Sequence, residues 1–103
     1  MILSGGQNIF PQDIEAVLVD HEDVADAAVI GLSSERWGET PVAVVVPAHE
    51  RVDADAIREW VNTRVGRQQR LADVRLTDGL PRNPNGKILK RELRRAYGEL
   101  RYE

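Results

Sequence analysis

Apolar positions in the first half of the chain switch between the spacing of a helix and the unbroken runs of buried strands. Pro11 suits the first position of a helix that runs to about Asp20. Residues 24–31 and 41–47 are predicted to be strands, and the second is apolar throughout its centre, as a strand buried on both faces would be. The apolar stripe of the predicted helix consists of Ile14, Val17 and Leu18.

The second half returns to helical spacing. Asp53 is a suitable N-cap for a helix that ends at Gly66, and a short strand is predicted over residues 74–76. A last helix is expected from Lys87 onward. The stripe of the earlier helix comprises Ile57, Trp60, Val61 and Val65, with Trp60 assigned to the core, and that of the last helix comprises Leu89, Leu93, Ala96 and Leu100.

The N-terminal residues predict a small hairpin. Ile2-Leu3 and Ile9-Phe10 flank a turn over residues 4–8 that contains two consecutive glycines. With the elements above, the pattern predicts an α+β fold: an N-terminal hairpin, a central sheet of about three strands and about three helices packed around it. No repeat or linker interrupts the chain, so residues 1–103 are expected to form one domain.

Length and composition restrict the function. A domain of 103 residues is too small for a two-lobed enzyme with an enclosed active site. The absence of cysteine excludes disulfides, thiolate metal sites and cysteine nucleophiles. The longest apolar run, Val42 to Val46, is far shorter than a membrane span, and no signal-peptide pattern opens the sequence. We therefore expect a cytoplasmic protein.

Charge is distributed unevenly along the chain. Residues 1–60 hold 12 acidic and 3 basic side chains, whereas residues 61–103 hold 5 acidic and 11 basic ones. One interpretation is two solvated faces. The other is a basic C-terminal part that meets an anion such as a phosphate, a nucleotide or a nucleic acid.

No complete catalytic set is visible in the sequence. A phosphate-binding P-loop is excluded, because Pro81 and Ile88 stand where it requires a glycine and a hydroxyl residue. His21 and His49 lack the spacing of metal ligands, and His21 suits a capping or surface position near a helix C-terminus. As an isolated catalyst the chain is expected to be inactive.

One lysine nevertheless occupies an unusual position, in DGLPRNPNGKILKRELRR at residues 78–95. Pro81 and Pro84 restrict the approach to Lys87, and Asn85-Gly86 reverses the chain just before it. A cation is disfavoured at a helix start, so an ordinary solvated lysine would not be expected there. A lysine projected from a stiffened loop is suited to meeting a phosphate or carboxylate that arrives from outside.

The same segment resembles the terminal signature of the adenylate-forming superfamily, which includes acyl-CoA synthetases, amino-acid adenylation domains and luciferases. Three further blocks resemble that family in the same order along the chain: ILSGGQNIFPQDIEAVL, DAAVIGLSSERWGETPVAVVVP and VRLTDGLPRNP. The resemblance covers essentially the whole chain. It implies the mobile C-terminal domain of a larger enzyme, with both the large N-terminal domain and the hinge residue, expected about two positions before Met1, absent from the sequence.

The resemblance also implies roles for particular residues. Lys87 matches the catalytic lysine that bridges the acid's carboxylate and the nucleotide during adenylation by ATP. After domain rotation, Gly5 and Gly6 would line the channel for the pantetheine arm of coenzyme A. Trp37, with Arg36 beside it, matches a position near the nucleotide end of the coenzyme. The residues expected to contact the coenzyme are Gly5, Gly6, Gln7, Arg36, Trp37 and Arg70.

Structural alternatives remain open for these residues. Gly5 and Gly6 suit a simple hairpin turn, and Trp37 suits the core or an interface with the large domain. Many relatives have an aromatic-Lys-x-Pro segment before the lysine loop, but residues 67–71 lack the aromatic residue and the proline. Arg70 is expected to retain a phosphate contact there, whereas stacking of adenine at Gln68 is lost.

Three functional hypotheses follow. The residues Ser4 to Ile9 resemble acyl-CoA synthetases that act on fatty or aryl acids, so the first is the C-terminal domain of such a ligase. Its Mg²⁺ would be held by the large domain, and no metal is expected in this chain. The second is an enzyme that loads a carrier protein. The third is a nucleic-acid-binding module with a basic helix, disfavoured by the acidic balance and the lack of interleaved aromatics.

Overall fold

A computed structural model describes residues 1–102, except for the side chain of Gln68, and it has the predicted α+β class. The elements follow the chain from an N-terminal hairpin to a C-terminal helix. They are β1 (Ile2–Ser4), β2 (Gln7–Ile9), α1 (Pro11–Leu18), β3 (Val24–Ser34), β4 (Gly38–Pro47), α2 (Ala54–Asn62), the 3₁₀ helix η1 (Arg67–Gln69), β5 (Asp73–Leu76) and α3 (Lys90–Tyr97).

The sheet is built around β4. β3 pairs with it antiparallel from Val24↔Pro47 to Ser34↔Gly38, and β5 pairs parallel with residues 42–45 of β4. The N-terminal hairpin joins the same sheet through Ser4↔Gly38. The sheet therefore has five strands. The prediction of about three was low, because it treated the hairpin as separate from the central sheet.

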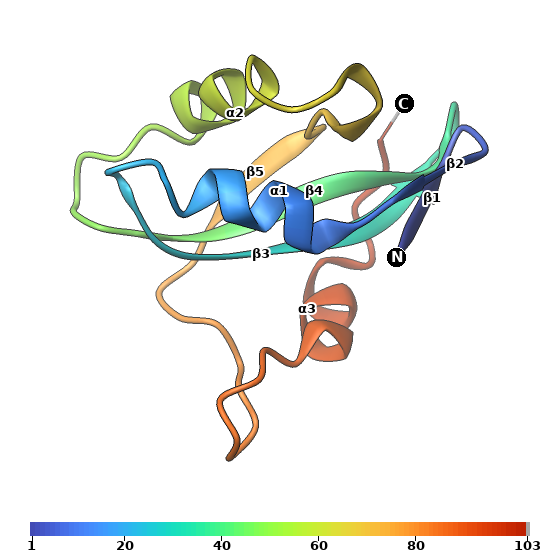
Figure 1. The fold of residues 1–103 in the computed structure, drawn as a ribbon. Coiled ribbons are helices and arrows are strands. Elements are labelled where there is room, and N and C mark those ends of the chain that lie inside the picture. The colour runs from blue at the N-terminus through green and yellow to red at the C-terminus, as the bar shows by residue number, and fades with distance from the viewer. Residues whose placement is uncertain (103) are drawn as a thin grey trace.

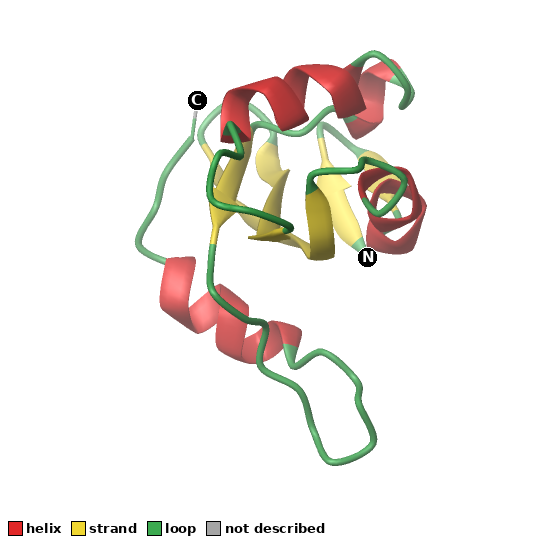
Figure 2. Ribbon diagram, turned by 90° about the vertical axis from the view of Figure 1, so that its left-hand side faces the viewer, coloured by secondary structure: helices red, strands yellow, loops and turns green. Residues whose placement is uncertain are grey.

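Helices cover both faces of this sheet (Figures 1 and 2). Strand residues alternate between the two faces, so neighbouring apolar positions enter different cores. On one face Ala43 and Val45 pack with residues of α1 and α2. On the other face Val42 and Val44 pack with Leu93 of α3. This two-sided burial explains why the middle of β4 is apolar without alternation.

The predicted helix starts were accurate where a local residue preference specifies them. α1 begins at Pro11, and the Asp53 carboxylate caps α2 by accepting hydrogen bonds from the amides of Asp55 and Ala56. The predicted stop at Gly66 was wrong, because α2 already ends at Asn62. Trp60 is half-buried at the border of the core.

The last helix differs most from its prediction. α3 begins at Lys90, not at Lys87, because Arg82 and Ile88 form an isolated bridge that holds the preceding residues in an extended loop. The expected conflict between Lys87 and a helix dipole therefore does not arise. Ala96, assigned to the buried stripe, is exposed, whereas Leu93 is buried. None of the helices within residues 1–102 has the length and apolar character needed to cross a membrane.

Candidate functional site

Lys87 lies in a narrow loop that extends away from the body of the domain (Figure 1). Its two sides are joined by main-chain hydrogen bonds. Leu89 N donates to Pro81 O at 2.8 Å, and Asn83 N donates to Lys87 O at 2.9 Å. At the tip, Gly86 adopts a φ of 86°, which favours glycine there. The loop is a hydrogen-bonded turn of defined shape.

The side chain of Lys87 is exposed and has no ion pair or hydrogen bond among the described residues. Lys90, the only other lysine of the chain, differs completely. Its Nζ lies 2.8 Å from Glu15 Oε2, and the same carboxylate oxygen accepts a hydrogen bond from Val29 N at 2.8 Å. Lys90 thus forms a structural ion pair with Glu15, whereas the ammonium of Lys87 remains available for an external anion.

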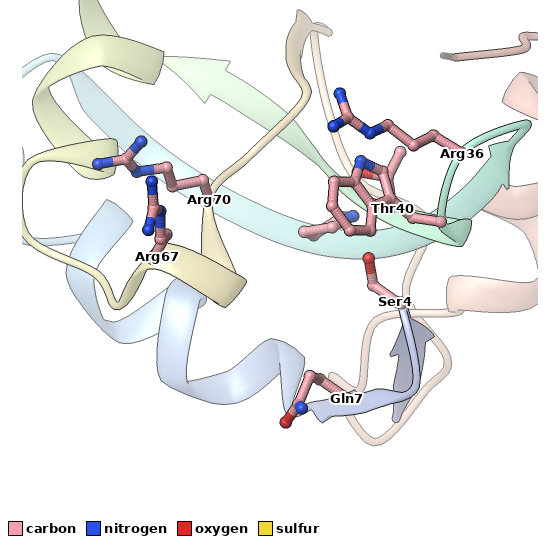
Figure 3. A pocket seen from close by; sticks show the side chains of 9 residues that line it. Ser4, Gln7, Arg36, Thr40, Arg67 and Arg70 are labelled. Atoms are coloured by element: carbon pink, nitrogen blue, oxygen red, sulfur yellow. The ribbon is translucent and has the colours of Figure 1, made fainter.

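A second site is a pocket of about 590 Å³ between the N-terminal hairpin and η1 (Figure 3). Segments from four parts of the sequence line it: the hairpin, the β3–β4 turn, the start of β4, and η1 with the residue after it. The lining residues are Ser4, Gly5, Gln7, Arg36, Trp37, Thr40, Pro41, Arg67 and Arg70.

Glycine is required where the hairpin meets the β3–β4 turn. Gly5 and Gly6 both have positive φ, at 57° and 80°, as in the two-residue turns that match strand twist. Gly5 N donates a 2.8 Å hydrogen bond to Trp37 O. A Cβ atom on Gly5 would lie 2.7 Å from Trp37 Cε3, whereas one on Gly6 would meet no atom within 4 Å. The two glycines therefore form the turn of the hairpin, and Gly5 also packs against the pocket's aromatic residue.

Trp37 is 45% exposed, so it is not a core residue of this domain. The guanidinium carbon of Arg36 lies 4.9 Å from the centre of its ring. The opposite side of the pocket carries the guanidinium groups of Arg67 and Arg70, which Figure 3 shows near each other. These two arginines have no acidic partner among the described residues. The pocket therefore combines an open aromatic ring with three cations.

The main chain of Tyr102 is hydrogen-bonded to the residues that lead into the β3–β4 turn. Tyr102 N donates to Ser33 O at 3.0 Å, and Glu35 N donates to Tyr102 O at 2.9 Å. The Tyr102 hydroxyl donates to Asp73 Oδ2 at 2.7 Å. Burial, and then this hydrogen bond and the negative charge of Asp73, raise the pKa of Tyr102 to about 12. Tyr102 thereby links the turn that bears Arg36 and Trp37 to the first residue of β5.

Most residues singled out in the sequence gather at these two places. Gly5, Gln7, Arg36, Trp37 and Arg70 line the one pocket, Gly6 lies beside it without lining it, and Lys87 lies elsewhere. Four further lining residues were not predicted from the sequence: Ser4, Thr40, Pro41 and Arg67. Arg67 stands three residues before Arg70, and that basic spacing was the available signal.

The histidines do not form a site. His21 packs edge-on against Trp60 with ring centres 4.7 Å apart, and His49 Nε2 lies 2.8 Å from Asp23 Oδ1. Within residues 1–102 no group of three or more His, Cys, Asp or Glu residues is placed to hold a metal ion.

Comparison with known proteins decides the family. The model of the AMP-binding enzyme C-terminal domain matches residues 13–87. The chain belongs to this family. Long-chain-fatty-acid–CoA ligase FadD13 of Mycobacterium tuberculosis is 43% identical over 97 residues, which are 94% of this chain and 19% of that protein. Feruloyl-CoA synthase of an Amycolatopsis species is 46% identical over 99 residues, 95% of this chain and 20% of that protein.

Solved structures agree with the family assignment. A fatty acyl-CoA synthetase of Mycobacterium tuberculosis superimposes with a TM-score of 0.90 at 42% identity, over 98% of this chain and 20% of that one. The o-succinylbenzoate CoA synthetase of Bacillus subtilis, solved with its acyl-adenylate intermediate, gives 0.82 at 37% identity, over 89% of this chain and 19% of that one. The chain thus spans about a fifth of the length of its relatives, and the predicted resemblance to the C-terminal domain of adenylate-forming enzymes is confirmed.

Proposed function

We propose that this AMP-binding enzyme C-terminal domain acts within an ATP-dependent acyl-CoA ligase. In the first half-reaction a carboxylate oxygen attacks the α-phosphate of ATP, giving acyl-AMP and pyrophosphate. In the second, the thiol of coenzyme A attacks the acyl carbon, giving a thioester and AMP. The domain would contribute Lys87 to the first step and the pocket around Trp37 to the second.

The observation that carries this proposal is the state of Lys87. Its ammonium is exposed and unpaired within the described residues, while the main chain on both sides of it is hydrogen-bonded. A cation held in this way stabilises negative charge as the carboxylate attacks, and little reorganisation is needed at that moment. Lys87 also ends the segment that the family model matches.

The pocket suits the nucleotide end of coenzyme A. Arg36, Arg67 and Arg70 supply donors for phosphate oxygens, and guanidinium groups bind such anions in two-pronged geometry. The exposed ring of Trp37 offers an apolar face for a base or for the pantetheine arm. The hairpin turn at Gly5 and Gly6 would border the path of that arm, where main chain without side chains leaves room.

The Lys87 loop and the pocket around Trp37 have no residue in common. If both serve one active centre in the large domain, the small domain must present different parts of its surface in the two half-reactions. Rotation about the hinge between the domains would achieve this exchange. Mg²⁺ bound with ATP would be held by the large domain.

The named relatives suggest the class of acid. Two are called a long-chain-fatty-acid–CoA ligase and a feruloyl-CoA synthase, and another is called an indoleacetate–CoA ligase. We therefore propose a fatty or aryl acid as the substrate of the parent enzyme. An enzyme that loads the pantetheine of a carrier protein is the alternative acceptor class, because the same pocket would accept the arm from either source.

The deciding experiment separates the two half-reactions in the full-length enzyme. Lys87→Ala should reduce ATP–pyrophosphate exchange by roughly 10²–10³-fold, the usual cost of removing one preorganised charge-stabilising group. Thioester formation from supplied acyl-adenylate should remain close to wild type. Arg95→Ala, a change of an exposed residue on α3, is the matched control and should leave both steps unchanged. Equal losses of both half-reactions in Lys87→Ala would contradict the assigned role.

The isolated chain provides a second test. It should give neither pyrophosphate exchange nor thioester, because the acid and ATP pockets belong to the large domain. Exchange activity in the pure 103-residue chain with a common fatty acid would refute this division of roles.

A further inference from the structure

One ion pair connects the Lys87 loop to the edge of the sheet. Arg82 Nη2 contacts Asp26 Oδ2, although the two residues are 56 positions apart in the sequence. From Nη1 the same guanidinium donates a 2.6 Å hydrogen bond to the carbonyl oxygen of Gly86. Gly86 immediately precedes Lys87. A single planar group therefore joins a β3 side chain to the main chain next to the lysine.

The Asp26 end of this connection is itself fixed. Asp26 lies on β3 where the pairing with β4 shifts register between Val24 and Asp26. Its Oδ1 accepts a 3.0 Å hydrogen bond from Ala27 N, which leaves Oδ2 for Arg82. The carboxylate is one-third exposed, so water does not fully screen the pair. The Ala27 amide and the Arg82 guanidinium thus hold both carboxylate oxygens of Asp26.

Asn83 fixes the main chain at Lys87. Its Oδ1 accepts hydrogen bonds from the amides of Asn85 and Lys87, both at 2.9 Å. Its own amide donates to Lys87 O, also at 2.9 Å. Both main-chain polar groups of Lys87 are therefore bound by one residue. Only the side chain beyond them remains without a polar partner among the described residues.

We propose that Asp26, Arg82 and Asn83 are positioning residues for Lys87, a role that rests on the adenylation step proposed above. The loop projects from the domain (Figure 1), and Arg82 is its side-chain connection to β3. Asn83 sets the shape of the turn, and the Asp26–Arg82 pair sets its angle to the sheet. When the domain rotates as a body, this connection carries Lys87 to its target in one fixed orientation.

The chemistry requires an arginine at position 82. Its guanidinium presents several N–H groups in a rigid plane, so it binds the carboxylate and the carbonyl at the same time. A lysine ammonium is a compact charge, and from this position it would bind one of the two but would not span both. Arg82→Lys should therefore keep the charge and lose the positioning.

The test measures adenylation in full-length enzyme carrying Arg82→Ala or Asp26→Asn. We expect the kcat of ATP–pyrophosphate exchange to fall roughly 10- to 100-fold, as for a catalytic group displaced by about 1 Å. The KM values for ATP and acid should change little, and thioester formation from supplied acyl-adenylate should match wild type. Arg82→Lys should recover only a small part of the loss.

A matched control uses another arginine–aspartate pair. Arg58→Ala removes the partner of Asp55 on α2, a pair 4.0 Å apart and remote from the loop, and should leave both half-reactions unchanged. The sharper control adds Arg82→Ala to Lys87→Ala. Because Arg82 acts through Lys87, the double variant should exchange pyrophosphate no more slowly than Lys87→Ala alone.

The outcomes separate the two proposals. A further loss in the double variant, or equal losses of adenylation and thiol transfer in Arg82→Ala, would mean that the pair supports folding and not the lysine. Wild-type exchange in Arg82→Ala and Asp26→Asn, with Lys87→Ala inactive, would overturn the positioning role alone. Wild-type exchange in Lys87→Ala would instead overturn the adenylation role on which it depends.

Discussion

The Lys87 loop and the pocket around Trp37 are built in opposite ways. The loop is one continuous segment, and its main-chain bonds join residues between Pro81 and Leu89. The pocket takes its lining from four segments that only the folded sheet brings together. A local loop keeps its shape through its own hydrogen bonds, whereas the pocket depends on how the hairpin, the β3–β4 turn and η1 fit together. The first suits a single charged group, and the second suits a large ligand with several recognisable parts.

Beyond Lys87 itself, the largest effect that would test this contrast is expected at Gly6. In the full-length enzyme, Gly6→Leu should reduce thioester formation roughly 10- to 100-fold, because the leucine side chain would enter the path proposed for the pantetheine arm, and overpacking typically costs about 1–3 kcal/mol. Pyrophosphate exchange should be spared. Gly6→Asn is the control, since asparagine tolerates the left-handed conformation and its side chain is smaller. If both half-reactions fell together in Gly6→Leu, the turn would matter for folding only.

A smaller effect is expected at the basic side of the pocket. Arg70→Ala should raise the KM for coenzyme A by up to about fivefold, in line with the roughly 1 kcal/mol of an exposed charge pair. The rise should shrink at high salt, because exposed charges are screened. Steady-state kinetics at two ionic strengths measures this, with Arg51→Ala in the loop after β4 as the control. An unchanged KM for coenzyme A at both salt concentrations would remove Arg70 from the site.

The hydrogen bond between Tyr102 and Asp73 should make the stability of the domain depend on pH in alkaline solution. The folded pKa of Tyr102, about 12, lies above its ordinary value near 10, so the stabilisation from the protonated hydroxyl is complete below pH 10. It is lost as the pH rises from 10 through 12. Tyr102→Phe should lower the free energy of unfolding by about 1 kcal/mol at pH 8 and should remove this alkaline decline.

Urea denaturation of the chain at pH 8 and pH 11 tests this prediction. Tyr97→Phe is the control, because the Tyr97 side chain makes no hydrogen bond within the described residues. An alkaline decline of the same size in wild type and Tyr102→Phe would show that the bond to Asp73 contributes nothing.

The smallest effect compares the two lysines. Lys90→Met removes the ion pair with Glu15 and keeps most of the aliphatic stem, so it should cost about 0.5–1 kcal/mol of stability. Pyrophosphate exchange should be unchanged. Lys87→Met should do the reverse, with no loss of stability and slow exchange. Melting curves and exchange rates of the two variants are sufficient, and similar behaviour of both would contradict the separation of a structural from a functional lysine.

Local structure followed the sequence pattern where a few neighbouring residues determine the outcome. Pro11 and Asp53 mark helix starts, and the glycine pair marks a turn, because each acts within its own segment. The pattern failed at Lys87, where a bridge between Arg82 and Ile88 delays the helix by three residues. The apolar spacing that begins at Leu89 predicts a helix, but helical periodicity does not reveal a bridge across the preceding loop.

The sites divide in the same way. Lys87 was chosen as a candidate from its own motif, and the glycines, Arg36 and Trp37 were chosen as candidates from theirs. That Gly5 touches Trp37 depends on pairing between β1 and β4, which the sequence pattern does not encode. The contact of Asp26 with Arg82 spans 56 positions, and no local spacing marks either residue. Thr40 also becomes a lining residue only after the sheet forms.

The carboxylate of Glu15 has one more consequence, for self-association. β3 lies at an edge of the sheet, where free amides attract a strand from another molecule. Glu15 accepts the amide of Val29, Asp26 accepts that of Ala27, and Tyr102 pairs with the far end of β3. With these groups already bonded, the edge offers few free amides to a strand of a second copy.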